Sequence, residues 1–156
     1  MRVRRLITEH KTQESDTGWR HDDMPPRFAP LFTRTRPIRV GWQWRSAKAD
    51  SVERQYILTA LCNASRDNWQ AMLILCGQEG ASTIGRFEYH GSHPGLHAHA
   101  DCERSGLELG AVSLDNLPRR PSATELHRRM PAWTEATFWE AARRFFRVQE
   151  RKGPLL

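Results

Sequence analysis

The fold of this chain is decided by the stretch Arg86-Phe-Glu-Tyr-His-Gly-Ser-His-Pro-Gly-Leu-His-Ala-His-Ala-Asp-Cys102, which holds four of its seven histidines. Apolar and ionisable residues alternate on both sides of a turn that contains Gly and Pro. Side chains two residues apart in a strand lie on the same face, so the alternation predicts a β-hairpin. One face of this hairpin would be apolar and the other ionisable.

The ionisable face of the predicted hairpin collects imidazole, carboxylate and guanidinium groups from both strands: Arg86, Glu88, His90, His97, His99 and Asp101. Both apolar faces coincide in one register, whose pairs would be His90 with His97, Glu88 with His99, and Arg86 with Asp101. Sliding one strand by two residues gives other pairs on the same two faces, so that alternative stays open.

This ionisable face has the composition of an acid–base site. Neighbouring carboxylates orient imidazoles and adjust their charge, which suits general acid and base catalysis near neutral pH. An exposed antiparallel face is also polar without any function, so this alternative remains. The candidate catalytic residues are His97 and His99, then His90, with Glu88 or Asp101 as orienting groups and Arg86 as the cation that stabilises developing negative charge.

The same face offers metal binding as a second chemistry, because a His-x-His pair on a strand aims two rings at one point. The spacing of Gly91, His97, His99, Glu103 and Gly110 resembles the first motif of the cupin family, Gly-x5-His-x-His-x3-Glu-x6-Gly. This resemblance implies a barrel in which His97, His99 and Glu103 bind a divalent transition metal. The second cupin motif, with its further histidine, is missing downstream.

The rest of the chain predicts more strands and one helix. Alternating or apolar segments bounded by turn residues occupy 38–45, 54–63, 69–76, 83–90, 96–102 and 107–114, with 46–51 as a loop and a buried helix as the alternative for 69–76. Short strands joined by short turns favour an antiparallel meander over βαβ units. Thr134 would cap a helix that runs to about Glu150, with an apolar stripe of Phe138, Trp139, Ala142, Phe145 and Phe146. The predicted fold class is α+β, an antiparallel meander of about six strands covered by a C-terminal helix.

The length of 156 residues suits one domain with an additional arm. Residues 1–36 have no sustained period and contain several prolines, which predicts an extended or partly disordered N-terminal arm. Residues 37–156 would then form a single α+β domain. Within it, residues 118–131 combine prolines with arginines and would be a basic connector with at most a short helix at 123–129.

The charge balance indicates an anionic partner. The formal net charge is +6, from 24 Lys and Arg against 18 Asp and Glu, and Arg far outnumbers Lys. Arginine suits bidentate contacts with phosphate, so RNA or another nucleic acid is the expected partner, although an Arg-rich host composition would give the same balance. The residues expected to hold backbone phosphates are Arg119, Arg120, Arg128 and Arg129.

The cysteines and the apolar segments predict a cytoplasmic location. Cys62, Cys76 and Cys102 are odd in number and form no Cys-x-x-Cys pair, which argues against a disulfide framework and fits a reducing compartment. No apolar run approaches the roughly 20 residues that span a bilayer, and the basic N-terminus lacks the apolar region of a signal peptide. We therefore expect no membrane partner.

The order of features resembles the small bacterial proteins of the TumE-like toxin family over roughly residues 38–150. The shared features are a sheet, the Arg-aromatic-acidic strand that begins at Arg86, the His-rich turn and strand, and a closing helix with Phe138-Trp-Glu140. The resemblance implies a toxin that acts on RNA or another nucleic acid and pairs with an antitoxin.

Three hypotheses for function follow. The first is a small toxin-like protein that acts on nucleic acid. It would be a metal-independent ribonuclease without a cofactor, with histidines as acid and base. The second is a cupin-like metal-binding enzyme that uses His97 and His99. The third is a component of a toxin–antitoxin or defence assembly without catalysis, suggested by the Pro-rich arm and the Arg-rich end of the C-terminal helix.

Overall fold

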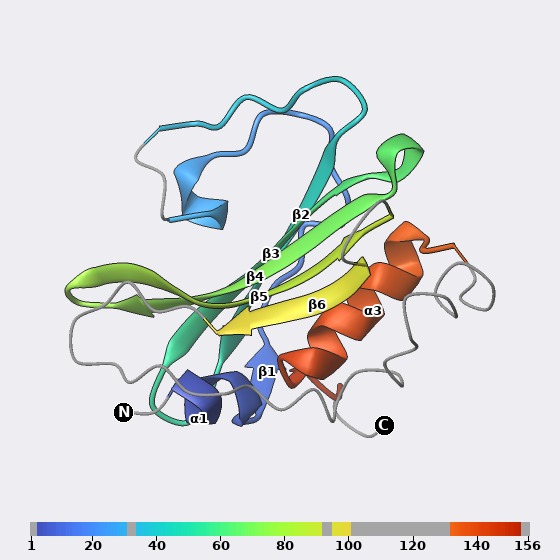
Figure 1. Cartoon of the computed structure of the whole chain (residues 1–156). Coiled ribbons are helices and arrows are strands. Elements are labelled where there is room, and N and C mark those ends of the chain that lie inside the picture. The colour runs from blue at the N-terminus through green and yellow to red at the C-terminus, as the bar shows by residue number, and fades with distance from the viewer. Residues whose placement is uncertain (1–2, 31–33, 92–94, 101–131, 154–156) are drawn as a thin grey trace.

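The computed structural model describes residues 3–30, 34–91, 95–100 and 132–153. They form a sheet with the strand order β6-β5-β4-β3-β2-β1-β7. Its strands are β1 (Lys11–Gln13), β2 (Gln43–Asp50), β3 (Gln55–Asn63), β4 (Asn68–Gly77), β5 (Gly80–His90), β6 (Gly95–Ala100) and β7 (Val148–Glu150). The first six strands form an antiparallel meander, and β7 is parallel to β1 at one edge. The α+β meander with a C-terminal helix is therefore confirmed (Figure 1).

Helix α3 (Glu135–Phe145) covers one face of this sheet (Figure 1). A capping box begins it, since Thr134 Oγ1 accepts from the Thr137 amide and Thr137 Oγ1 accepts from the Thr134 amide. Phe138 packs 5.5 Å from Trp69 and 5.6 Å from Phe87, measured between ring centroids. All five residues of the predicted apolar stripe are buried: Phe138, Trp139, Ala142, Phe145 and Phe146.

The prediction that this helix continues to Glu150 is wrong. The helix ends at Phe145, and Arg147 has a left-handed backbone with a φ of 57°. The chain then forms β7, whose Val148 is buried in the core. Pairing with β1 satisfies the hydrogen-bonding groups of the main chain in β7. A strand of three residues is too short to show a sequence pattern that would predict this pairing.

The main core lies between the sheet and α3, with the short helix α1 (Val3–Thr8) on the same side. Alternate residues of the two central strands enter it: Tyr56, Leu58, Ala60 and Cys62 from β3, and Trp69, Ala71, Leu73 and Leu75 from β4. A smaller cluster of Met24, Ala29, Trp44 and Leu61 lies on the opposite face. The segment between β1 and β2, which includes the 3-10 turn η1 (Pro26–Phe28), covers that face (Figure 1).

The N-terminal segment differs from the predicted extended or partly disordered arm. Its residues 3–8 form α1, which buries Val3, Leu6 and Ile7, and residues 11–13 form β1 inside the sheet. Further along, the Ser46 and Thr59 hydroxyls both donate to the Phe28 carbonyl and fix the segment to the sheet. The division into an arm (1–36) and one domain (37–156) stays an interpretation.

Three predicted strands, 54–63, 69–76 and 83–90, are confirmed as β3, β4 and β5, so the helical alternative for 69–76 is wrong. The predicted strand 38–45 is displaced: β2 runs over residues 43–50, and the predicted loop 46–51 is mostly strand. A turn occupies the earlier residues, because the Trp42 amide donates to the Arg39 carbonyl and Gly41 has a φ of 86°. The predicted strand 107–114 and the connector 118–131 lie outside the described residues.

No helix in the described part of the chain is long and apolar enough to cross a membrane.

Candidate nucleic-acid interface and acid–base site

The predicted hairpin is present as β5 and β6, with a register that differs from the predicted one by two residues. The backbone pairs are His90 with Gly95, Glu88 with His97, and Arg86 with His99. The connection comprises residues 91–94, whereas the predicted pairs required 91–96, so β6 starts two residues earlier. A shift by two residues leaves each residue on the same face of the sheet. Positions 86, 88 and 90 of β5 therefore share one face with positions 97 and 99 of the neighbouring strand β6.

Arg86, Glu88 and His90 form an ion cluster on this face of β5. The Arg86 Nη1 atom lies 3.8 Å from Glu88 Oε1, and the His90 Nε2 atom lies 3.7 Å from Glu88 Oε2. Only 12% of the Glu88 side chain is exposed, against 41% for Arg86 and 26% for His90. A single sheltered carboxylate thus lies within ion-pair distance of an imidazole on one oxygen and of a guanidinium on the other.

The other predicted site residues are described only in part or not at all. For His97 and His99 the structure describes the backbone alone. Outside the described residues lie Asp101, Glu103, Gly110, Arg119, Arg120, Arg128 and Arg129. The predicted phosphate contacts and the cupin-like ligand set are therefore untested.

The ion cluster belongs to a row of cross-strand neighbours on the face opposite α3. The row runs from Trp44 on β2 through Leu61 on β3 and Gln70 on β4 to Glu88 on β5 and the backbone of His97 on β6. Directly opposed residues in antiparallel strands share a face and lie about 5 Å apart. The row therefore connects the covered, apolar end of this face to its ionisable end.

A cavity of about 570 Å³ opens beside this row and is called the arginine pocket here. Leu61 and Gln70 contribute from the sheet, and the remaining lining residues are Arg36, Pro37, Ile38, Arg39 and Trp42 from the segment before β2 and Arg66 from the turn η2. Its volume falls within the range of roughly 300–1,000 Å³ that is typical of small-ligand sites. Three guanidinium groups and an indole give this cavity the character of an anion site with an aromatic wall.

Main-chain bonds anchor the segment that forms one wall of the pocket. The amides of Met24 and Arg36 each donate to the other's carbonyl at 2.9 Å. The Ile38 amide donates to Asp23 Oδ1 at 3.0 Å, and the Trp44 indole donates to the Asp22 carbonyl at 2.6 Å. The pocket wall is thus held before any ligand arrives, which reduces the entropy lost on binding.

The turn η2 (Ala64–Arg66) brings Arg66 close to the end of the hairpin. Asn63 Oδ1 accepts from the Arg66 amide at 3.2 Å, and Asp67 follows in a left-handed conformation with a φ of 49°. The Gly91 amide then donates to the Asp67 carbonyl at 3.0 Å. A Cβ at position 91 would lie 2.4 Å from Asp67 Oδ2, so a larger residue there would have to displace the Asp67 side chain.

Sequence reasoning missed the arginine pocket. The usable signal was the concentration of four arginines and two tryptophans within 34–45, a composition typical of nucleic-acid contacts. The sequence assigned part of this segment to a strand, whereas its first half forms a turn and an anchored wall. Arg66 and Gln70 lie far from it in sequence and join it only through the sheet pairing.

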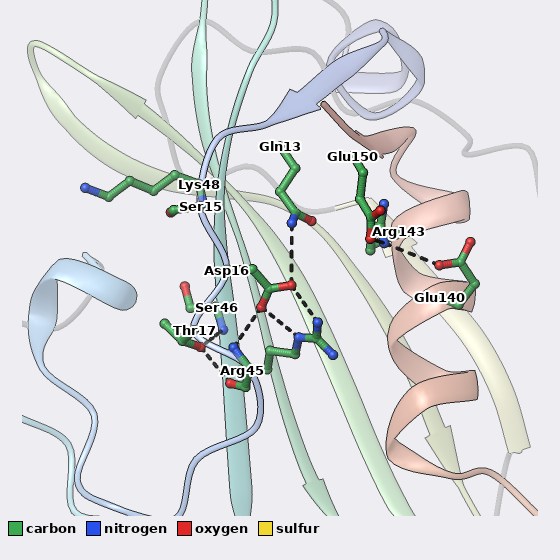
Figure 2. Close-up of polar contacts among 11 residues, drawn as sticks. Gln13, Ser15, Asp16, Thr17, Arg45, Ser46, Lys48, Glu140, Arg143 and Glu150 are labelled. Atoms are coloured by element: carbon green, nitrogen blue, oxygen red, sulfur yellow. Dashed lines mark hydrogen bonds and ion pairs between the residues drawn. The ribbon is translucent and has the colours of Figure 1, made fainter. Parts of the chain in front are cut away.

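A second polar contact, between Arg45 and Asp16, lies on the side of the sheet that faces α3 and has a structural role (Figure 2). Arg45 donates through Nε to Asp16 Oδ1 at 2.8 Å and also lies 4.6 Å from the Trp139 ring centroid. Burial alone would raise the pKa of Asp16, but hydrogen bonds from Arg45 and the Gly18 amide outweigh it and lower that pKa. Asp16 and Arg45 pair with each other, so they tie β2 to the loop after β1, and the contact of Arg45 with Trp139 ties β2 to α3.

Cys62, buried in the core, is not an activated nucleophile. Burial, with a contribution from Glu135, raises the pKa of the Cys62 thiol to about 12. Such a thiol stays protonated near neutral pH, and the thiolate is the reactive form.

No group of three or more His, Cys, Asp or Glu side chains that could hold a metal occurs among the described residues. The candidate ligands His97, His99 and Glu103 fall outside that search, because their side chains are not described. No family model, curated protein or solved structure matches this chain.

Proposed function

We propose that this protein binds RNA against the sheet face opposite α3 and cleaves it by acid–base catalysis without a metal ion. The observation that carries the proposal is the adjacency of two features: the arginine pocket, which includes Gln70, and the ion cluster, which contains its neighbour Glu88. The first feature suits phosphate binding and the second suits proton transfer, and RNA cleavage requires both.

Each group of the ion cluster has a role in this reaction. His90, oriented by Glu88, removes the proton from the ribose 2′-hydroxyl as the general base. The freed oxygen bonds to phosphorus, the bond from phosphorus to the leaving 5′-oxygen breaks, and a second imidazole protonates that oxygen. His97, backbone-paired with Glu88, is the proposed acid, with His99 as the alternative. Arg86 stabilises the extra negative charge on the phosphate.

The chemistry supports two direct tests. A single-stranded RNA should be cut to a cyclic phosphate and a 5′-hydroxyl end, whereas an all-deoxy copy of the same sequence should stay intact, because it lacks the nucleophile. Cleavage should continue in excess EDTA. Product ends are identified by mass spectrometry, with His97→Ala and His99→Ala compared to find the acid.

Cleavage of the deoxy strand at a similar rate would overturn the proposed mechanism. Loss of activity in EDTA, restored by one transition metal and absent in the His97→Ala/His99→Ala double variant, would favour the cupin-like alternative instead. No cleavage of either strand would point to a binding protein without catalysis.

A further inference from the structure

We infer that the arginine pocket receives an unpaired nucleotide, so that the protein selects single-stranded over duplex nucleic acid. The inference rests on the proposed function for its ligand class and deepens it by naming the strand form and the residues that select it. Its basis is the combination of one indole with three guanidinium groups around one cavity of about 570 Å³.

The aromatic part of the pocket accounts for recognition of a base. Trp42 lines the cavity and is half-buried. It packs against the apolar cluster that contains Trp44 and Leu61. An indole fixed in this way presents a flat apolar surface on which a base can stack, whatever its identity. A base in a duplex is stacked on its neighbours and paired, so it cannot enter a cavity of this size without leaving the helix.

The basic part accounts for the backbone that flanks this base. Arg36 and Arg39 come from the anchored wall, and Arg66 comes from η2 on the other side. Two separate elements thus bring guanidinium groups to one opening, which is suited to a chain of phosphates that passes across it. Arg39 and Arg66 are both exposed, so their side chains reach solvent and can bind a ligand without rearrangement of the core.

Gln70 adds a polar group from the sheet and connects the pocket to the scissile phosphate. Its Nε2 atom donates to Asn68 Oδ1 at 3.0 Å, which fixes the orientation of the amide. Glu88 lies opposite Gln70 on the next strand. A nucleotide that contacts Gln70 would lie about one strand spacing, roughly 4.8 Å, from Glu88. We therefore expect a neighbouring phosphate of the same strand to reach Arg86 and His90.

The test measures binding by fluorescence anisotropy with a labelled single-stranded RNA of eight nucleotides and with the same strand in a duplex. A His90→Ala background slows cleavage during the measurement. We expect the single strand to bind at least about tenfold more tightly than the duplex, and Trp42→Ala and Arg66→Ala each to weaken it about tenfold. Arg66→Ala should also reduce the slope of log affinity against log salt by about 0.7.

Arg4→Ala is the matched control, since it removes one exposed guanidinium from α1 on the other side of the sheet and should leave the affinity unchanged. Trp42→Phe separates stacking from folding, because it keeps an aromatic surface and should recover part of the affinity. Equal affinities for single strand and duplex would overturn the inference, as would an Arg66→Ala protein that binds like Arg4→Ala.

The inference and the proposed function fail in different ways. If Arg66→Ala binds RNA normally while the wild-type protein still cleaves it without metal, the pocket assignment is wrong and the proposed function stands. If the pocket variants lose binding but the wild-type protein cleaves nothing, the pocket stands and the proposed catalysis is wrong.

Discussion

Gln70 on β4 is the direct antiparallel neighbour of Glu88 on β5. Gln70 lines the arginine pocket, and Glu88 is within ion-pair distance of both Arg86 and His90. Since neighbouring strands lie about 4.8 Å apart, an anion that contacts Gln70 would lie next to the candidate catalytic groups. This single pair turns two separate features of the surface into one candidate site.

The first prediction concerns the shared carboxylate of the ion cluster. Glu88→Gln keeps the shape of the side chain but removes the charge that orients His90 and pairs with Arg86. We expect kcat/KM for RNA cleavage to fall at least about tenfold, with little change in overall fold. Glu53→Gln is the control, because Glu53 is an exposed carboxylate in the β2–β3 loop. Equal rates for the two variants would contradict a role for Glu88.

Elements with a strong local pattern could be predicted from the sequence. Segments 54–63 and 69–76 are apolar enough to mark central strands, and the stripe on α3 has a helical period that only one face of a helix explains. The alternation of side chains along a strand was enough to predict the ionisable face of the hairpin. It therefore placed Arg86, Glu88 and His90 together, as the structure does.

Elements that depend on distant partners could not be predicted in this way. Residues 46–50 of β2 have small or polar side chains and become strand through pairing with β3, and β1 and β7 are three-residue strands joined from opposite ends of the chain. The arginine pocket likewise assembles from the segment before β2 together with β3, η2 and β4. Long-range pairing overrides weak local preference in each of these cases.

The second prediction concerns Lys11, which is fully buried where α1, β1 and the end of α3 meet. In its charged form its Nζ atom donates to the carbonyls of Ile7, Glu9 and Phe146 at 2.9–3.1 Å. Lys11→Met leaves these buried acceptors without this donor and should lower the free energy of unfolding by about 3 kcal/mol or more. Urea denaturation measures the change, with the exposed Lys48→Met as control.

The third prediction is a pH dependence of this same lysine. Burial outweighs the attraction of Glu9 and lowers the pKa of Lys11 from 10.5 to about 7. Between these values the unfolded chain binds a proton that the folded chain lacks, so the lysine's contribution to stability rises with pH through this window and is smallest below it. The difference in unfolding free energy, wild type minus Lys11→Met, should therefore increase from pH 7 to pH 10. A constant difference would show that Lys11 keeps its charge when folded.

The fourth prediction concerns Asp16, whose pKa is lowered mainly by Arg45 against the effect of burial. A lowered carboxyl pKa contributes stability above the unfolded value of 3.8 and loses it as the pH falls through the folded value. Asp16→Asn should cost about 1 kcal/mol at pH 7, because the pair is partly exposed, and the cost should vanish in acid. Glu79→Gln, in the exposed β4–β5 turn, is the control for denaturation curves at both pH values. A cost that persists in acid would assign the effect to packing.

The central claim is that the face opposite α3 cleaves RNA through its imidazoles, and one measurement tests it most directly. This is the single-turnover rate of RNA cleavage in excess EDTA for wild type, His90→Ala and the exposed His10→Ala, each confirmed as folded by its unfolding curve. We predict a loss of about 10² or more for His90→Ala and no loss for His10→Ala. Equal rates for the two variants, or no cleavage by the wild-type protein, would contradict the claim.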